Sequence, residues 1–110
     1  MALTQPTDRR LQPRMPANAR AVVVAPGLEL ACVIVDTSPG GLKIRTDRQL
    51  ALPSQVTVVD IVAGLATEAD VVWRKGVEAG LTLKGQSPLC GLVPSRLLPA
   101  REAWIRAGGR

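Results

Sequence analysis

The chain has 110 residues, of which 46% are apolar, so it is long enough for one modest hydrophobic core and too short for two. It contains no histidine and only two cysteines, fewer nitrogen and sulfur ligands than a zinc site needs. Because paired carboxylates, a serine–base pair and a metal-binding cluster are also missing from the pattern, we expect neither an enzyme nor a protein with a cofactor.

The net charge of +5 is concentrated at the two ends of the chain. Four arginines and one aspartate give residues 1–20 a charge of +3, and four arginines and one glutamate give residues 96–110 the same charge. Residues 21–95 carry six basic and seven acidic side chains, a net −1. Basic ends are typical of proteins that bind a nucleotide, a nucleic acid or an acidic surface, although tails that only increase solubility have the same composition.

Along the chain, residues 1–19 contain three prolines and no apolar periodicity, which indicates an irregular arm. After the arm come short runs rich in Val, Ile, Leu and Ala, each ended by turn-forming residues. The predicted strands are residues 21–25, 29–35, 42–46, 55–62, 67–74 and 78–83.

These strands recur about every 8–12 positions, and no helical stretch of about 12 residues separates them, which indicates an antiparallel sheet rather than βαβ units. Closing such a sheet removes its exposed edges. We therefore predict an all-β single domain, a six-stranded antiparallel barrel over residues 20–85 between the arm (1–19) and a C-terminal tail with a short helix (86–110).

The tail has the boundary residues of a short helix. Pro99 suits a first helical turn, and Gly108 suits the position just beyond the last turn. We expect Trp104 and Ile105 to pack this helix onto the barrel.

The two cysteines indicate a reducing environment. In a chain without a secretion signal, Cys32 and Cys90 are expected to be small buried hydrophobic residues rather than a disulfide. The first residues lack the apolar run of a signal peptide, and no stretch of about 18 apolar residues could cross a bilayer. We therefore expect a cytoplasmic protein that does not insert into a membrane.

Two short motifs carry the functional hypothesis. Arg10 and Arg14 form an RxxxR pattern on the arm, which is a weak signal in a chain so rich in arginine. Residues 36–41 fit DxSxxG and lie between two predicted strands, where Asp, Ser, Pro and Gly could also form a plain turn.

The order and spacing of these motifs are more specific than either motif alone. Twenty-one residues separate Arg14 from Asp36, and a Val-Val-Trp-Arg run at 71–74 precedes Gly-Leu-Thr-Leu at 80–83. Together with the arm, six strands and terminal helix, this set resembles the PilZ domain, a bacterial receptor family for cyclic di-GMP. The resemblance covers roughly residues 8–85, and it implies a binding module with a PilZ-like β-barrel fold. Leu83 stands where the family often has Phe, a departure that affects packing more than binding.

The arm arginines have the chemistry that such a ligand requires. A guanidinium can bond phosphate oxygens, or the O6/N7 edge of guanine, through paired hydrogen bonds, and it can stack on a base. We expect Arg10 and Arg14 to have these roles. The resemblance further implies that Arg9, directly before RxxxR, favours a stacked pair of ligand molecules over a single one.

The DxSxxG residues supply complementary groups. Asp36 offers a carboxylate to the N–H groups of a guanine, and Ser38 offers a hydroxyl to a base or phosphate. Gly40 and Gly41 let the backbone and a ligand approach closely. The resemblance implies one site on the outer face of the barrel, with the arm folded over cyclic di-GMP. Ligand binding would then order the arm and be read by an unknown downstream protein.

Two other functions are compatible with the sequence. The chain could be a degenerate PilZ-like domain that binds only protein, or a small basic barrel that binds nucleic acid. Nucleic acid is disfavoured because single-strand-binding barrels usually display stacking aromatics, whereas Trp73 and Trp104, the chain's two aromatic residues, are expected in the core or on the barrel face.

Overall fold

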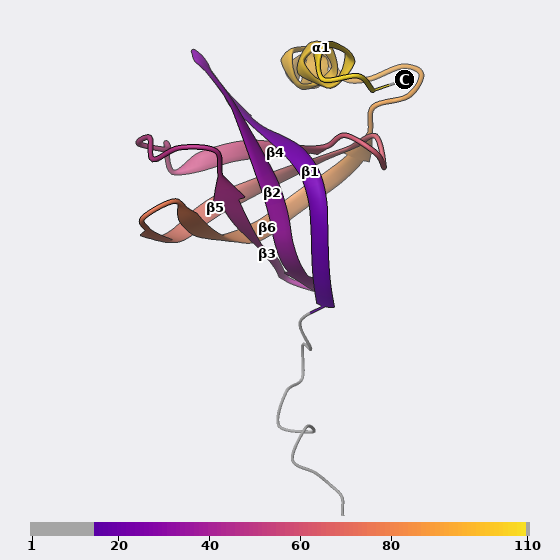
Figure 1. Cartoon of the computed structure of the whole chain (residues 1–110). Helices are drawn as coiled ribbons and strands as arrows, with labels where there is room; N and C mark the ends of the chain where they lie inside the picture. Colours follow the sequence, from indigo (N-terminus) through magenta and orange to yellow (C-terminus); the bar gives the residue numbers. More distant parts are fainter. Residues whose placement is uncertain (1–14, 110) are drawn as a thin grey trace, which may run out of the picture.

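A computed structural model describes residues 15–109 and shows a closed antiparallel barrel with one short helix (Figure 1). Neighbouring strands around the barrel follow the order β1-β2-β3-β6-β5-β4. The strands are β1 (Met15–Ala25), β2 (Leu28–Ser38), β3 (Gly41–Thr46), β4 (Gln55–Asp60), β5 (Leu65–Lys75) and β6 (Glu78–Pro88). The predicted six-stranded fold is therefore confirmed, and Gly76 in the β5–β6 hairpin has the positive φ (62°) that such a tight turn uses.

Several strands are longer than the sequence predicted, whereas β4 ends at Asp60, two residues before the expected end at 62. β1 begins at Met15, inside the expected arm, and β6 extends to Pro88, beyond the expected limit at residue 85. The prediction placed Pro16 in the arm because proline is normally absent from the middle of a sheet. Here Pro16 pairs with Asp36 of β2, whereas the pairing of β1 with β4 covers only residues 21–24, so proline occupies a position with a single neighbouring strand.

The interior of the barrel forms the first of two cores. Alternate residues of each strand point inward, as the period of two requires, and most of them are small or β-branched. The fully buried members with less than 2% exposure include Val23, Leu30, Ile44 and Val58. Aliphatic side chains therefore fill the barrel without any aromatic residue.

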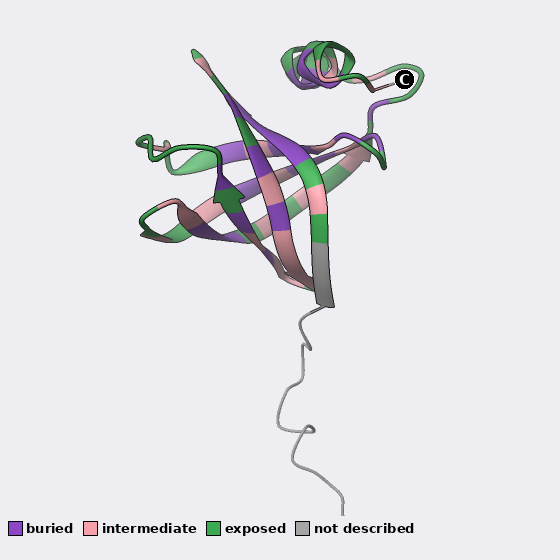
Figure 2. Cartoon of the chain, in the orientation of Figure 1, coloured by how far each residue is buried: buried purple, intermediate pink, exposed green. Residues whose placement is uncertain are grey.

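A second core joins the outside of the barrel to the C-terminal segment. A 3-10 turn (Ser95–Leu97) leads into α1 (Leu98–Arg106), which packs against β1 and β4. Leu97, Ala100, Ala103 and Trp104 are buried there, and the buried residues of α1 lie on the side toward the barrel (Figure 2). Trp104 therefore packs the helix as predicted, whereas the prediction for Ile105 is wrong.

The helical geometry accounts for this error. Ile105 directly follows Trp104, so it is turned by about 100° around the axis, and its side chain is 55% exposed. Both ends of the helix have the expected residues. Pro99 lies in the first turn, and Gly108, with a φ of 101°, lies just beyond the last turn. No helix within residues 15–109 is long and apolar enough to span a membrane.

The tail is also tied to the barrel by polar contacts. Arg96 donates to Glu68 through Nε and Nη2 at 3.3 Å, and Arg106 makes the same paired contact with Glu29. Cys32 is buried inside the barrel, whereas Cys90 is exposed after β6. The expectation of two buried cysteines therefore fails at Cys90, because the chain leaves the sheet at Pro88 and only Leu89 turns into the second core.

Candidate functional site

The structure describes four of the seven predicted site residues. Asp36 and Ser38 end β2, Gly40 lies in the following turn, and Gly41 begins β3. The other three, Arg9, Arg10 and Arg14, lie outside the described residues. The first described residue, Met15, pairs with Thr37, so β1 starts beside this motif turn. We call the β2–β3 turn together with the start of β1 the motif end; it lies opposite α1 (Figure 1).

An irregularity in β2 sets the direction of the motif side chains. Cys32 and Ile34 belong to the interior core, which by strict alternation would also turn residue 36 inward. The pairing of β2 with β3 shifts between Ile34 and Asp36, so that Asp36 lies opposite Lys43 and Thr37 lies opposite the buried Leu42. This bulge places Asp36, and with it Ser38, on the outer face of the barrel.

A small hollow lies on this outer face between the motif turn and the β5–β6 hairpin. Its volume is about 190 Å³, and we call it the motif hollow. It is lined by Ser38, Gly40, Gly41, Leu42, Val72, Trp73, Gly80, Leu81 and Thr82. Three predicted site residues therefore share one hollow, and Asp36 lies on the same face just outside it.

Gly41 is required by the sheet itself. A Cβ atom at this position would lie 2.6 Å from the backbone oxygen of Leu81, closer than β3 and β6 allow. The neighbouring Gly40 accepts a hydrogen bond from the backbone N–H of Leu83 at 3.1 Å. The close packing of β3 against β6 therefore requires glycine at position 41, in addition to the expected need for a ligand to approach closely.

Trp73 is the main lining residue that the sequence did not assign to the site. It lies opposite Gly80 on β6, where a Cβ atom would come within 1.9 Å of the Trp73 Nε1 atom, so the indole covers the glycine. The side chain remains 40% exposed, and the adjacent Val72 is 59% exposed. The Trp in β5 paired with a Gly in β6 is the sequence signal that could have identified it.

Lys43 is a second group that the sequence did not assign. Its cross-strand neighbours are Asp36 on β2 and Gly80 on β6, so it lies between the motif strand and Trp73. Its Nζ atom is 3.6 Å from Oε1 of Glu78. A cation is thus present on the face that carries the motif residues.

These groups together form a surface suited to a flat polar molecule. The indole of Trp73 offers a stacking face, while Ser38 and Thr82 offer hydroxyl groups. A hollow of this volume accommodates one base-sized group rather than a whole dinucleotide, because pockets that enclose drug-sized ligands have about 300–1,000 Å³.

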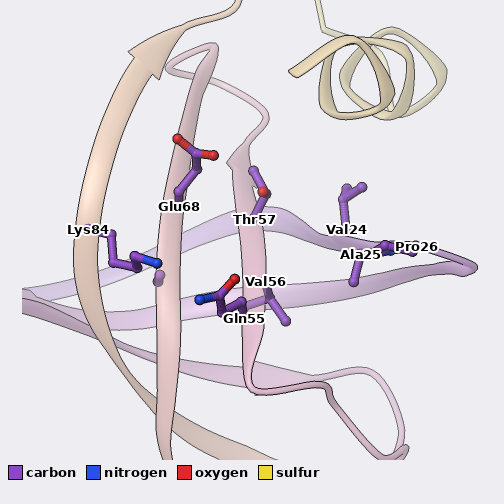
Figure 3. A pocket seen from close by; sticks show the side chains of 9 residues that line it. Val24, Ala25, Pro26, Gln55, Val56, Thr57, Glu68 and Lys84 are labelled. Atoms are coloured by element: carbon purple, nitrogen blue, oxygen red, sulfur yellow. The ribbon is translucent and has the colours of Figure 1, made fainter. Parts of the chain in front are cut away.

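Larger hollows lie elsewhere on the barrel. One of about 370 Å³ lies beside β4, β5 and β6 and is lined in part by Gln55, Glu68 and Lys84 (Figure 3). Both charged groups are already engaged, Glu68 with Arg96 and Lys84 with Asp70. Because none of its lining residues belongs to either motif, this hollow is a weaker candidate than the motif hollow.

Comparison with known proteins identifies one family. The family model described as PilZ domain matches residues 8–89, a span that begins before Arg9 and ends one residue after β6. No curated protein and no solved structure gives a significant match. The matched span thus contains every predicted site residue and all six strands.

Proposed function

The chain belongs to the PilZ domain family, whose members are cyclic di-GMP-binding modules rather than enzymes, and we propose that it is a receptor for cyclic di-GMP. One observation carries this proposal. Ser38, Gly40 and Gly41 line a hollow on the outer face of the barrel, and Asp36 is turned to the same face by the bulge in β2. The DxSxxG residues therefore share one surface.

In the proposed complex, one guanine enters the motif hollow. Trp73 stacks on its face, Ser38 contacts its edge or the phosphate, and the Asp36 carboxylate accepts from its N–H groups. Base–aromatic stacking contributes about 1–3 kcal/mol per base. Replacing Trp73 by Ala is therefore expected to weaken binding by roughly 5- to 150-fold.

The arm supplies the remaining contacts. The hollow holds only part of the ligand, so the phosphates and second guanine need other groups. Arg14 directly precedes Met15, which pairs with Thr37 of the motif strand. Arg10 is five residues before Met15, and a chain of five residues reaches at most about 18 Å. Both guanidinium groups can therefore reach a ligand at the motif end.

Signalling follows from this division of contacts. We propose that the ligand bridges the arm and the motif turn, orders the arm, and creates a surface that a downstream protein recognises. Ligand should then protect the peptide bonds after Arg9, Arg10 and Arg14 from trypsin. Cleavage at these bonds with unchanged rate at saturating ligand would contradict the ordering step while leaving binding intact.

Calorimetric titration with cyclic di-GMP tests the proposal. We expect saturable binding by the whole chain, and a loss of roughly 10- to 150-fold for Arg10→Ala or Arg14→Ala, because each removes charge-assisted hydrogen bonds. The double variant Arg48→Ala/Arg101→Ala removes two cations away from the motif end, one after β3 and one in α1, and should bind nearly as the parent does.

Three results discriminate the alternatives. Two ligands per chain would support the role expected of Arg9, and one would contradict it. No heat from folded protein would overturn the receptor function in favour of a protein-binding domain. Equal losses in the Arg10/Arg14 and Arg48/Arg101 variants would show that only net charge matters, as expected for nucleic-acid binding.

A further inference from the structure

Three cations surround Glu78 on the outer face of the barrel. In the sheet register, Glu78 lies directly opposite Arg45 of β3 on one side and Lys75 of β5 on the other. Its carboxylate nevertheless contacts the diagonal neighbour Lys43, with 3.6 Å between Oε1 and Nζ. Within residues 15–109 Arg45 has no ion pair, and its side chain is exposed. Glu78 thus has one partner in use and two further cations, Arg45 and Lys75, directly opposite it.

Lys43 in turn lies between Glu78 and the candidate site. It is directly opposite Asp36 on one side and Gly80 on the other, and the indole of Trp73 covers Gly80. The Lys43 and Glu78 side chains are 31% and 34% exposed. A partly exposed ion pair of this kind contributes little to stability, about 0–1 kcal/mol, so its exchange for another partner costs little.

We propose that cyclic di-GMP binding switches this pair. Lys43 leaves Glu78 for a ligand phosphate, and Glu78 then turns to Arg45. The proposal rests on the receptor function above. Without ligand, three charged groups form one ion pair and leave Arg45 unpaired. With ligand, Lys43 pairs with phosphate and Glu78 pairs with Arg45, so that two ion pairs replace one.

The exchange of partners changes the charge of a surface that the ligand does not touch. Arg45 lines a different hollow, of about 550 Å³, whose walls include Arg20, Ala31 and Val33 on β1 and β2. Arg20 and Arg45 both lie opposite Val33, on its two sides. When Glu78 engages Arg45, this surface loses one unpaired positive charge although no ligand atom touches it.

A second ion pair on the barrel serves as the matched control. Lys84 and Asp70 are 3.9 Å apart and 47% and 44% exposed, comparable to Lys43 and Glu78. Lys84 belongs to β6 and Asp70 to β5, away from Arg45 and Asp36. Removing either member changes the net charge in the same way without touching the proposed switch.

Calorimetry on the whole chain with cyclic di-GMP gives the first test. We expect Lys43→Ala to weaken binding by about 5- to 10-fold, the loss of one charge-assisted contact at a partly exposed site. Glu78→Gln is expected to tighten binding by about 2- to 5-fold, because Lys43 no longer has to leave a carboxylate. Lys84→Ala and Asp70→Asn should match the parent.

The opposite outcomes are distinguishable. If the parent binds and Lys43→Ala binds equally well, or Glu78→Gln weakens binding, the switch is wrong and the receptor function stands. If the parent binds no ligand, both fail. Circular dichroism of each variant shows whether it has folded.

The arginine side-chain NMR signals give a readout that a merely structural role would not change. Saturating ligand should shift the Arg45 Nε–H resonance and slow its exchange with water in the parent protein. The same shift should be absent in Glu78→Gln, which binds ligand but offers no carboxylate. An Arg45 signal that ligand leaves unchanged in the parent overturns the proposal.

Discussion

The two tryptophans of this chain lie at opposite ends of the barrel and differ in how they are held. Trp104, at the α1 end, is 4% exposed and donates from Nε1 to the backbone oxygen of Ile61 at 2.8 Å. Trp73, at the motif end, covers Gly80 but is 40% exposed beside the motif hollow. One indole closes a core, and the other leaves a face open. The α1 end is therefore closed by a buried indole, whereas the motif end, where we propose that ligand binds, leaves an indole partly exposed.

Replacing each tryptophan by Ala gives the largest test of this contrast. Trp104→Ala should lower the free energy of unfolding by about 3–5 kcal/mol, because it empties the second core and leaves Ile61 without its donor. Trp73→Ala should cost clearly less and act mainly on ligand affinity. Urea unfolding of both variants measures the difference, and equal losses would contradict the division of roles.

The packing of Trp73 on Gly80 can be broken from the other side. A Cβ atom in Gly80→Ala would occupy the position of the indole, which must then move away from the barrel. We expect a loss of about 1–3 kcal/mol from this overpacking and a red shift of the tryptophan fluorescence. Gly85→Ala, where a Cβ atom meets only Glu68 at 3.9 Å, is the matched control. An unshifted spectrum would show that Trp73 does not depend on Gly80.

The pH dependence of stability tests the barrel interior, where the Cys32 thiol is buried. Burial raises the pKa of the Cys32 thiol to about 12 from 9.0. Between pH 9.0 and about 12 the Cys32 thiol loses its proton in the unfolded chain and keeps it in the folded chain. The free energy of unfolding is therefore unaffected by this group below pH 9 and falls as the pH rises above 9. The slope should approach about 1.4 kcal/mol per pH unit.

A matched variant isolates the thiol. Cys32→Val should show a flatter decline than the parent between pH 9 and 11, measured by urea unfolding. Identical curves would mean that Cys32 does not carry the effect. At pH 8, iodoacetamide should modify the exposed Cys90 and leave the buried Cys32 unmodified until the protein unfolds.

The smallest effect is expected from the ion pairs that tie the tail to the barrel. Arg96→Ala removes the paired contact with Glu68, whose partners are 61% and 33% exposed. Solvent screens such a pair, so the loss of stability should be about 0.2–1 kcal/mol and should shrink in high salt. A larger loss would mean that polar contacts, and not the buried side chains around Trp104, hold α1.

The strand pattern was predictable from local sequence, whereas its exact ends were not. Turn residues between short apolar runs located all six strands, and the family resemblance was confirmed over residues 8–89. Pro16 concealed the first residues of β1, since the rule against proline in a sheet does not apply where a strand has only one neighbour.

The finer geometry depends on contacts between distant segments. The bulge that turns Asp36 outward exists only in the register of β2 against β3. The register of β3 against β6 places Glu78 opposite Arg45 and diagonal to Lys43, with which it forms the ion pair. Neither follows from spacing along the chain, because residues 36, 43 and 78 come together only when the sheet closes.

The sequence by itself determined the fold class, the family and the chemical types of the candidate ligand-binding residues. These properties depend on local patterns: apolar alternation, turn residues and two short motifs. The tertiary structure decided which tryptophan is buried, which face carries Asp36 and which cation Glu78 holds. Those outcomes depend on strand register and on the docking of α1, where small differences in packing between distant residues determine the result.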